Sequence, residues 1–100
     1  MTRCTVYITP VALREIKDLP GYVRQRIKRA IDDLADNPRP SDSQALNLPG
    51  LDSDVWRLRL DKWRIVYAIT DADNIIDVLA VRKRPPYDCG DLERLLADML

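Results

Sequence analysis

One apolar stripe with the period of an α-helix runs through the region that precedes the first long polar stretch. Its members recur at intervals of one, three and four residues: Val23, Ile27, Ala30, Ile31 and Leu34. The stripe predicts an amphipathic helix that ends by Asn37 and Pro38. A shorter helix is expected before it, over Val11–Leu19, because Thr9 offers a capping hydroxyl and Pro10 suits a first helical turn.

Shorter apolar runs have the character of strands. Four strands are expected, over Thr5–Ile8, Val55–Leu60, Trp63–Thr70 and Ile75–Arg82. The last two runs are almost continuously apolar, which is typical of strands covered on both faces. Polar residues between the last three runs, at Asp61–Lys62 and Asp71–Asn74, are the expected turns.

Two segments complete the expected fold. Residues 38–54 are rich in Pro, Ser, Asp and Gly and are expected to form a long loop, while Asp88 can cap a short last helix. The order β-α-α-β-β-β-α predicts an α+β fold, in which a two-helix hairpin packs on an antiparallel sheet and a short C-terminal helix follows. A length of 100 residues favours one domain over 1–100.

The composition excludes several kinds of chemistry. The chain has no histidine, which removes every Ser-His or Cys-His nucleophile and the commonest general base. Cys4 and Cys89 alone cannot make a usual zinc site, and we expect neither metal nor cofactor. No apolar run approaches the roughly 18 residues of a membrane span, and the N-terminal residues do not resemble an export signal. The expectation is therefore a cytoplasmic protein with no membrane contact and with free thiols.

The charges balance overall but not locally. Lysine plus arginine and aspartate plus glutamate each number 16, which argues against a protein that coats nucleic acid through a broad positive charge. Residues 22–30 nevertheless sum to +4 and residues 55–85 to +3, whereas residues 31–54 sum to −5. Any binding of an anion should therefore be local.

The expected hairpin gathers arginines on one face. A turn at Asp61–Lys62 places Arg59 opposite Arg64, and strand alternation puts Arg57 on the same face. The other face is apolar and comprises Trp56, Leu58, Leu60, Trp63, Ile65 and Tyr67. Like charges placed directly opposite one another cost up to about 1 kcal/mol, so the pattern favours a site for phosphate, which guanidinium groups bind well. The alternative is an ordinary solvated face, neutralised in part by Asp61 or Asp77.

Further cations extend this pattern. Arg82, Lys83 and Arg84 end the last expected strand, and the second helix begins with Arg24, Arg26, Lys28 and Arg29. Part of the helical group can neutralise itself through the i,i+4 pairs Lys28–Asp32 and Arg29–Asp33. Cations at a helix start also oppose the helix dipole, which keeps a role facing RNA open. Tyr87, after two prolines, is either a packing residue at a helix entry or a phenol that stacks or reacts near Arg84.

The run VWRLRLDKWRIVYAI, residues 55–69, resembles the core of the RelE/ParE toxin superfamily. The later run IIDVLAVRKR and the following Tyr87 fit the same pattern, as do the two helices over 11–37. RelE-like members use basic residues on the first hairpin strand, an arginine after the turn, an arginine at the end of the last strand and a C-terminal tyrosine. These positions correspond to Arg57, Arg59, Arg64, Arg84 and Tyr87, although Lys83 or Arg82 could take the place of Arg84. This sequence departs from the pattern in having arginine where lysine is frequent, and arginine is a poor general base.

The resemblance implies the toxin of a type II toxin–antitoxin system, with a RelE-like fold and a RelB-like antitoxin as its partner. It implies a ribosome-dependent mRNA endoribonuclease that needs no metal, with mRNA and the ribosome as its other partners. Arg57, Arg59, Arg64, Arg84 and Tyr87 are then the candidate catalytic residues, and Lys83, Arg82, Lys28 and Arg24 are candidate substrate-binding residues. Two alternatives stay open: a ParE-like inhibitor of DNA gyrase, and a degenerate member that only binds its antitoxin.

Overall fold

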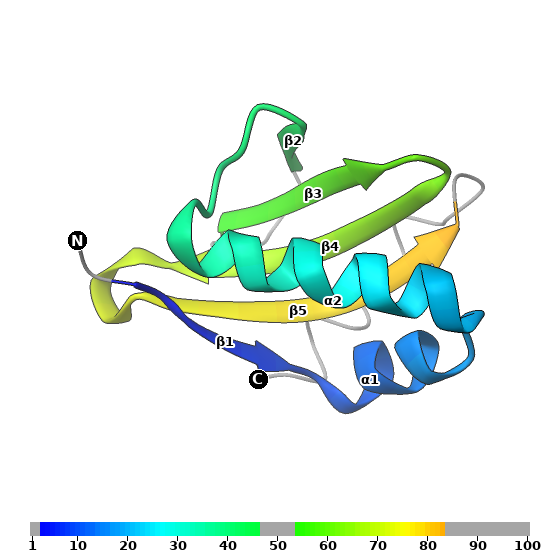
Figure 1. The fold of residues 1–100 in the computed structure, drawn as a ribbon. Helices are drawn as coiled ribbons and strands as arrows, with labels where there is room; N and C mark the ends of the chain where they lie inside the picture. Colours follow the sequence, from blue (N-terminus) through cyan, green and yellow to red (C-terminus); the bar gives the residue numbers. More distant parts are fainter. Residues whose placement is uncertain (1–2, 47–53, 84–100) are drawn as a thin grey trace.

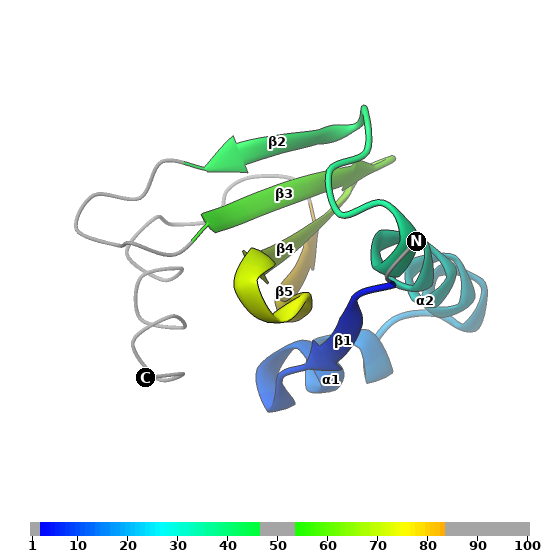
Figure 2. The same ribbon diagram turned by 90° about the vertical axis from the view of Figure 1, so that its left-hand side faces the viewer.

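A five-stranded mixed sheet forms the centre of the computed structural model, which describes residues 3–46 and 54–83. The elements follow in the order β1 (Thr5–Ile8), α1 (Pro10–Lys17), α2 (Gly21–Asp36), β2 (Ser43–Leu46), β3 (Asp54–Leu60), β4 (Trp63–Thr70), a 3₁₀ turn (Asp71–Asp73) and β5 (Ile75–Lys83). The strands are arranged in the order β1-β5-β4-β3-β2. Figures 1 and 2 show both helices on the same side of this sheet, with α2 crossing its strands. The α+β class predicted from the sequence is confirmed.

The start of α1 shows how one residue joins a helix to the sheet. The Thr9 hydroxyl accepts a hydrogen bond from the Ala12 main-chain N–H at 3.3 Å, as expected for a helix cap. The same hydroxyl donates to the Val78 carbonyl of β5 at 2.9 Å. Thr9 therefore fixes the position of α1 on β5, just beyond the end of β1.

Two features of the sheet differ from the expectation. The sheet is mixed and not antiparallel, because β1 pairs in parallel with β5, from Thr5 opposite Ile75 to Ile8 opposite Val78. The segment expected to be one long loop contains β2, which pairs antiparallel with β3 at the edge of the sheet. β2 has the sequence SQAL, with Gln44 and Ala45 exposed and no residue buried, and it lacks the apolar alternation that identifies a strand. The expected last helix, from Asp88, lies outside the described residues.

The sheet is apolar on both faces. Against the helices it packs the main core, whose fully buried side chains include Ile16, Ile27, Leu34, Ile65, Tyr67, Ile76 and Val78. A second buried cluster contains Val55, Val66, Ala68, Leu79 and Ala80. A β-bulge makes this possible, since the register shifts between Val66 and Tyr67 and leaves Leu79 as the extra residue of β5. Within the described ranges, no helix has both the length and the apolar character needed to cross a bilayer.

Arg39 joins three segments at one end of the sheet. Its guanidinium forms ion pairs with Asp54 at 2.6 Å and with Asp71 at 2.9 Å, and its Cζ lies 5.4 Å from the centre of the Trp56 ring. Hydrogen bonds to Asp71 and Asp54 raise the pKa of Arg39 above its ordinary value, so the charge is permanent. The loop after α2 is thereby attached both to the start of β3 and to the turn before β5.

Substituting Arg39→Ala is expected to lower the free energy of unfolding by about 1–2 kcal/mol, measured by urea denaturation. Charge-assisted hydrogen bonds contribute more than an ordinary surface ion pair does, which raises the expected loss of stability. The partial exposure of the three side chains lowers the expected loss, because water screens the charges. Arg3→Ala is the matched control, because the Arg3–Asp36 pair is more exposed and its loss is expected to cost less than about 0.5 kcal/mol. Equal effects of the two substitutions would contradict the role given to Arg39.

Candidate functional site

The hairpin formed by β3 and β4 has the register expected from the sequence. Leu60 pairs with Trp63, Arg59 with Arg64, and Leu58 with Ile65. Arg64 is also opposite Arg82 of β5, so three arginines form one row across three strands. Alternation places Arg57 on the same face, which is the face opposite α1 and α2. We call Arg57, Arg59, Arg64 and Arg82 the arginine face.

Arg64 is the most buried of these arginines, with 7% of its surface exposed. Its Nη1 donates to the main-chain carbonyls of Asp61 and Trp63, both at 2.8 Å. The guanidinium therefore lies against the hairpin turn, and these hydrogen bonds offset the cost of placing it opposite Arg59. Arg64 acts both as a cation of the face and as a structural donor to the turn.

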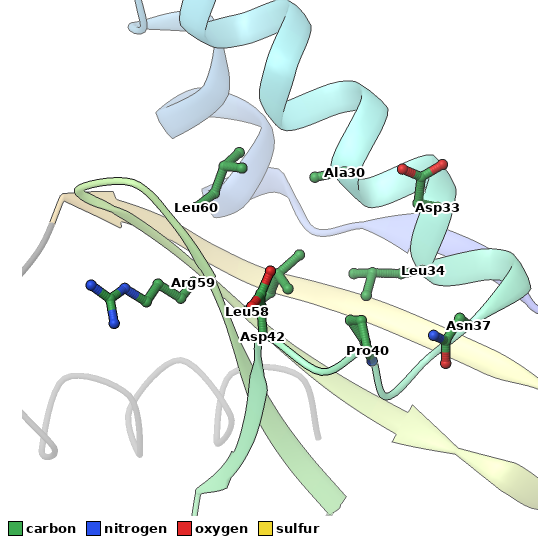
Figure 3. Close-up of a pocket in the computed structure, with 9 residues that line it drawn as sticks. All are labelled: Ala30, Asp33, Leu34, Asn37, Pro40, Asp42, Leu58, Arg59 and Leu60. Carbon is green, nitrogen blue, oxygen red and sulfur yellow. The ribbon is translucent and has the colours of Figure 1, made fainter.

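Arg57 and Arg59 lie nearer the β2 edge. Arg57 Nη2 donates to Gln44 Oε1 at 2.9 Å, across the β2–β3 pair. Arg59 is exposed, and within residues 3–46 and 54–83 its side chain has no ion-pair or hydrogen-bond partner. Figure 3 shows the Arg59 side chain extending away from the other residues that line a pocket of about 220 Å³ between α2 and β3. Arg59 is thus the described member of the arginine face that is most accessible to an external anion.

Arg82 is held by a carboxylate of α1. Glu15 Oε2 accepts a hydrogen bond from Arg82 Nε at 2.9 Å, and Glu15 Oε1 accepts one from the Val81 main-chain N–H at 3.1 Å. Since β1 pairs with β5 only as far as Val78, Glu15 supplies an acceptor that β1 does not provide. Glu15 therefore positions the last part of β5, which ends in Arg82 and Lys83.

Substituting Glu15→Ala is expected to lower the free energy of unfolding by about 1–2 kcal/mol, because it removes two acceptors from a half-buried site. Glu15→Gln keeps an acceptor for Val81 and should cost less. Hydrogen exchange at the Val81 amide should become faster in Glu15→Ala than in Lys17→Ala, an exposed change on the same helix. Unchanged exchange in Glu15→Ala would show that the contact does not protect this strand.

Asp61 and Asp77 are the two acids that could neutralise part of the arginine face. Asp61 adopts a left-handed φ of 53° in the turn, and its carboxylate accepts a hydrogen bond from Arg26 of α2 at 2.5 Å. Asp77 lies between Tyr7 and Ala68 in the register, and burial raises the pKa of its carboxyl above the ordinary value. The turn is consequently held by Arg26 from the helix side and by Arg64 through its main chain.

The remaining candidates are not gathered at the same place. Arg24 and Lys28 lie on α2, which covers the opposite face of the sheet from the arginine face. Neither Lys28–Asp32 nor Arg29–Asp33 is among the ion pairs of the described part of the chain. Lys83 is exposed and pairs with Trp63, so alternation directs it to the helix side of β5. Arg84 and Tyr87 lie outside the described residues.

Sequence reasoning missed three side chains that contact the arginine face or border it. Gln44 and Asp42 belong to the segment expected to be a loop, and Glu15 stands 67 residues before its partner Arg82. The signal for Gln44 would have been a fifth strand paired with β3, and SQAL does not identify one. Among the described residues, no group of three His, Cys, Asp or Glu side chains could hold a metal ion. The chemistry that the geometry offers is the binding of an anionic group by fixed guanidiniums.

Comparison with known proteins shows which family this chain belongs to. Residues 6–85 match the family model described as ParE toxin of type II toxin-antitoxin system, parDE. The chain is 33% identical over 73 residues to the "Putative toxin RelE1" of Methanocaldococcus jannaschii, a match that covers 72% of this chain and 80% of that protein.

Solved structures show the same arrangement of elements. RelE in the archaeal RelE–RelB complex from Pyrococcus horikoshii OT3 superposes with a TM-score of 0.73 at 28% identity, covering 87% of this chain and 100% of that chain. The isolated E. coli RelE toxin superposes with a TM-score of 0.64 at 22% identity, covering 97% of this chain and 99% of that chain. At this lower identity the second match shows the fold alone.

Proposed function

Because this chain belongs to the RelE/ParE family of type II toxin–antitoxin toxins, we propose that it is a ribosome-dependent mRNA endoribonuclease that stops translation. The observation that supports this best is the arginine face, where Arg59 is exposed beside the fixed guanidiniums of Arg57 and Arg64. Preorganised cations of this kind stabilise the charge that develops on a phosphate in a transition state.

The proposed reaction is cleavage by the neighbouring 2′-hydroxyl of the RNA. The 2′-oxygen loses its proton and attacks the adjacent phosphorus in line, and the bond from phosphorus to the 5′-oxygen of the next nucleotide breaks. The 5′-oxygen takes up a proton, so the products are a 2′,3′-cyclic phosphate and a 5′-hydroxyl. Every atom of this step comes from RNA and from exchangeable protons, so no metal and no cofactor is needed.

The proposed roles rest on the arginine face for Arg57, Arg59 and Arg64, and on the family resemblance for Arg84 and Tyr87. Arg57, Arg59 and Arg64 are proposed to neutralise the phosphate oxygens. Arg84 is proposed to stabilise or protonate the leaving 5′-oxygen. Tyr87 is proposed to act as the general base or to stack on a nucleobase of the RNA. An arginine is protonated at every physiological pH and cannot be the base itself. Lys83, Arg82, Lys28 and Arg24 are proposed as binding residues only, and the contact with Glu15 makes Arg82 a structural cation as well.

A RelB-like antitoxin is the proposed protein partner. The P. horikoshii and E. coli relatives were each crystallised as a toxin–antitoxin complex. A segment with acidic residues would be complementary to the arginine face. Binding there would compete directly with RNA.

The deciding experiment compares two targets. Purified toxin is added to ribosomes that carry a defined mRNA and, separately, to a supercoiling assay with DNA gyrase. We expect mRNA cut on the ribosome, with 2′,3′-cyclic phosphate ends, and normal supercoiling. Intact mRNA together with inhibited gyrase would replace the nuclease by a ParE-like activity, and the absence of both effects would indicate a member that only binds its antitoxin.

A further inference from the structure

We propose that Arg26 and Asp61 are positioning residues for the cleavage reaction, because they hold the β3–β4 turn in a conformation that presents its carbonyl to Arg64. Arg26 lies on α2, on the opposite side of the sheet from the arginine face. The contact therefore connects the helices to a cation of the proposed phosphate site. The inference rests on the proposed ribonuclease function and adds two residues that act on the reaction without contacting RNA.

Two hydrogen bonds link Arg26 to Arg64 through one residue of the turn. Arg26 Nη1 donates to Asp61 Oδ2 at 2.5 Å, and Arg64 Nη1 donates to the Asp61 main-chain carbonyl at 2.8 Å. The same Nη1 donates to the Trp63 carbonyl, so two carbonyls at the turn direct the guanidinium of Arg64. Figure 1 shows the first half of α2, in cyan, at the same end of the sheet as this turn. A shift of the turn would consequently move the guanidinium with it.

The backbone of Asp61 shows why the turn needs support. Its φ of 53° lies in the left-handed region, which side chains other than glycine rarely adopt, although aspartate tolerates it better than most. A residue in such a conformation persists where its surroundings fix it at more than one point. Asp61 meets this condition, since Arg26 binds its carboxylate and Arg64 binds its carbonyl.

Stability alone does not account for the pair formed by Arg26 and Asp61. The two side chains are 52% and 60% exposed, and an ion pair this accessible to water contributes little to the free energy of unfolding. A cation that stabilises a transition state must be held closely in place, because small displacements reduce the rate strongly. The pair is therefore suited to fixing the turn, and through it Arg64, more than to stabilising the fold.

The experiment measures single-turnover cleavage of a defined ribosome-bound mRNA at increasing toxin concentration. We expect Arg26→Ala to lower the maximal rate by about tenfold and to leave the half-saturating toxin concentration unchanged. Asp61→Gly should do the same, because glycine keeps the left-handed backbone but removes the carboxylate. Asp61→Asn keeps an acceptor for Arg26 and should retain most of the rate. Arg29→Ala removes an exposed charge from the same helix and should change the rate by less than about twofold.

Combination with Arg64→Ala shows through which residue Arg26 acts. Because Arg26 is proposed to act through Arg64, adding Arg26→Ala to Arg64→Ala should change the remaining rate by less than about twofold. The double variant of Arg26→Ala and Asp61→Gly should likewise be no slower than either single variant. A higher half-saturating concentration in Arg26→Ala, or a further loss of about tenfold in the Arg64→Ala background, would make Arg26 an RNA-binding residue and overturn the inference.

A measurement on the free toxin separates this inference from the function it rests on. Hydrogen exchange at the Arg64 guanidinium, followed by NMR, should be faster in Arg26→Ala and in Asp61→Gly than in Arg29→Ala. Unchanged exchange would overturn the positioning of Arg64, whether or not the toxin cleaves mRNA. Faster exchange without any cleavage by the wild-type toxin would overturn the ribonuclease and the catalytic role of the contact together. Thermal unfolding of each variant, expected within a few degrees of the wild type, shows that the changes do not come from lost structure.

Discussion

Arg64→Ala is expected to reduce ribosome-dependent mRNA cleavage by about 10²–10³-fold and to lower the free energy of unfolding by about 1–3 kcal/mol. The first effect follows from the loss of a fixed cation from the proposed phosphate site. The second follows because the Asp61 and Trp63 carbonyls lose the buried donor that they share at 2.8 Å. Single-turnover cleavage on defined ribosome complexes and urea denaturation measure the two effects separately.

Arg59→Ala is the matched variant for Arg64→Ala. Arg59 stands opposite Arg64 in the register but is exposed, so its removal should cost a similar factor in cleavage and less than about 0.5 kcal/mol in unfolding. Arg64→Lys keeps the charge but cannot bond the turn with a planar group, and should restore only part of both properties. Full cleavage activity in Arg64→Ala would remove this residue from the proposed site.

Tyr67→Ala is expected to lower the free energy of unfolding by about 3–5 kcal/mol, enough to unfold much of a marginally stable domain. The Tyr67 side chain is fully buried in the main core, and its hydroxyl donates to the Pro38 carbonyl at 2.7 Å. Tyr67→Phe removes the hydroxyl alone and should cost about 1 kcal/mol. A loss of cleavage in Tyr67→Phe at full stability would instead make this phenol part of the site.

The pH dependence of stability gives an independent check on Tyr67. Burial raises the pKa of the Tyr67 phenol above its ordinary value of about 10. Above pH 10 the unfolded chain releases this proton while the folded chain keeps it, so the native state binds more protons and stability falls as the pH rises. Tyr67→Phe lacks this contribution, and its deficit relative to the wild type should shrink between pH 9 and pH 11. A constant deficit over this range would show that burial does not perturb the phenol.

The hairpin could be predicted from the sequence because its determinants are local. A two-residue turn and strict alternation fixed the Arg59–Arg64 pairing, and the apolar stripe fixed the buried face of α2. The parallel pairing of β1 with β5 was missed because it depends on contacts between residues about 70 positions apart, which no local pattern encodes. β2 was missed because an exposed edge strand gains its structure from its neighbour β3 and not from its own residues.

The candidate site was also predictable only in part from the sequence. Alternation alone placed Arg57, Arg59 and Arg64 on one face, as the structure confirms. Their individual surroundings could not be read from the sequence, since Arg64 turns back to the main chain, Arg57 reaches Gln44 and Arg82 meets Glu15. These contacts distinguish the arginine that is available to a ligand from those that also support the fold.

The pairing of the first strand with the last described one also determines when the protein can form. β1 emerges early in synthesis, but its hydrogen-bonding partner, residues 75–78, is made roughly 70 residues later. Closing so long a loop is slow in comparison with local helix formation. Until β5 has been made, the β3–β4 hairpin can place Arg59 opposite Arg64, but Arg82 is missing from the row. The complete row of arginines therefore forms only after residues 75–83 have been synthesised.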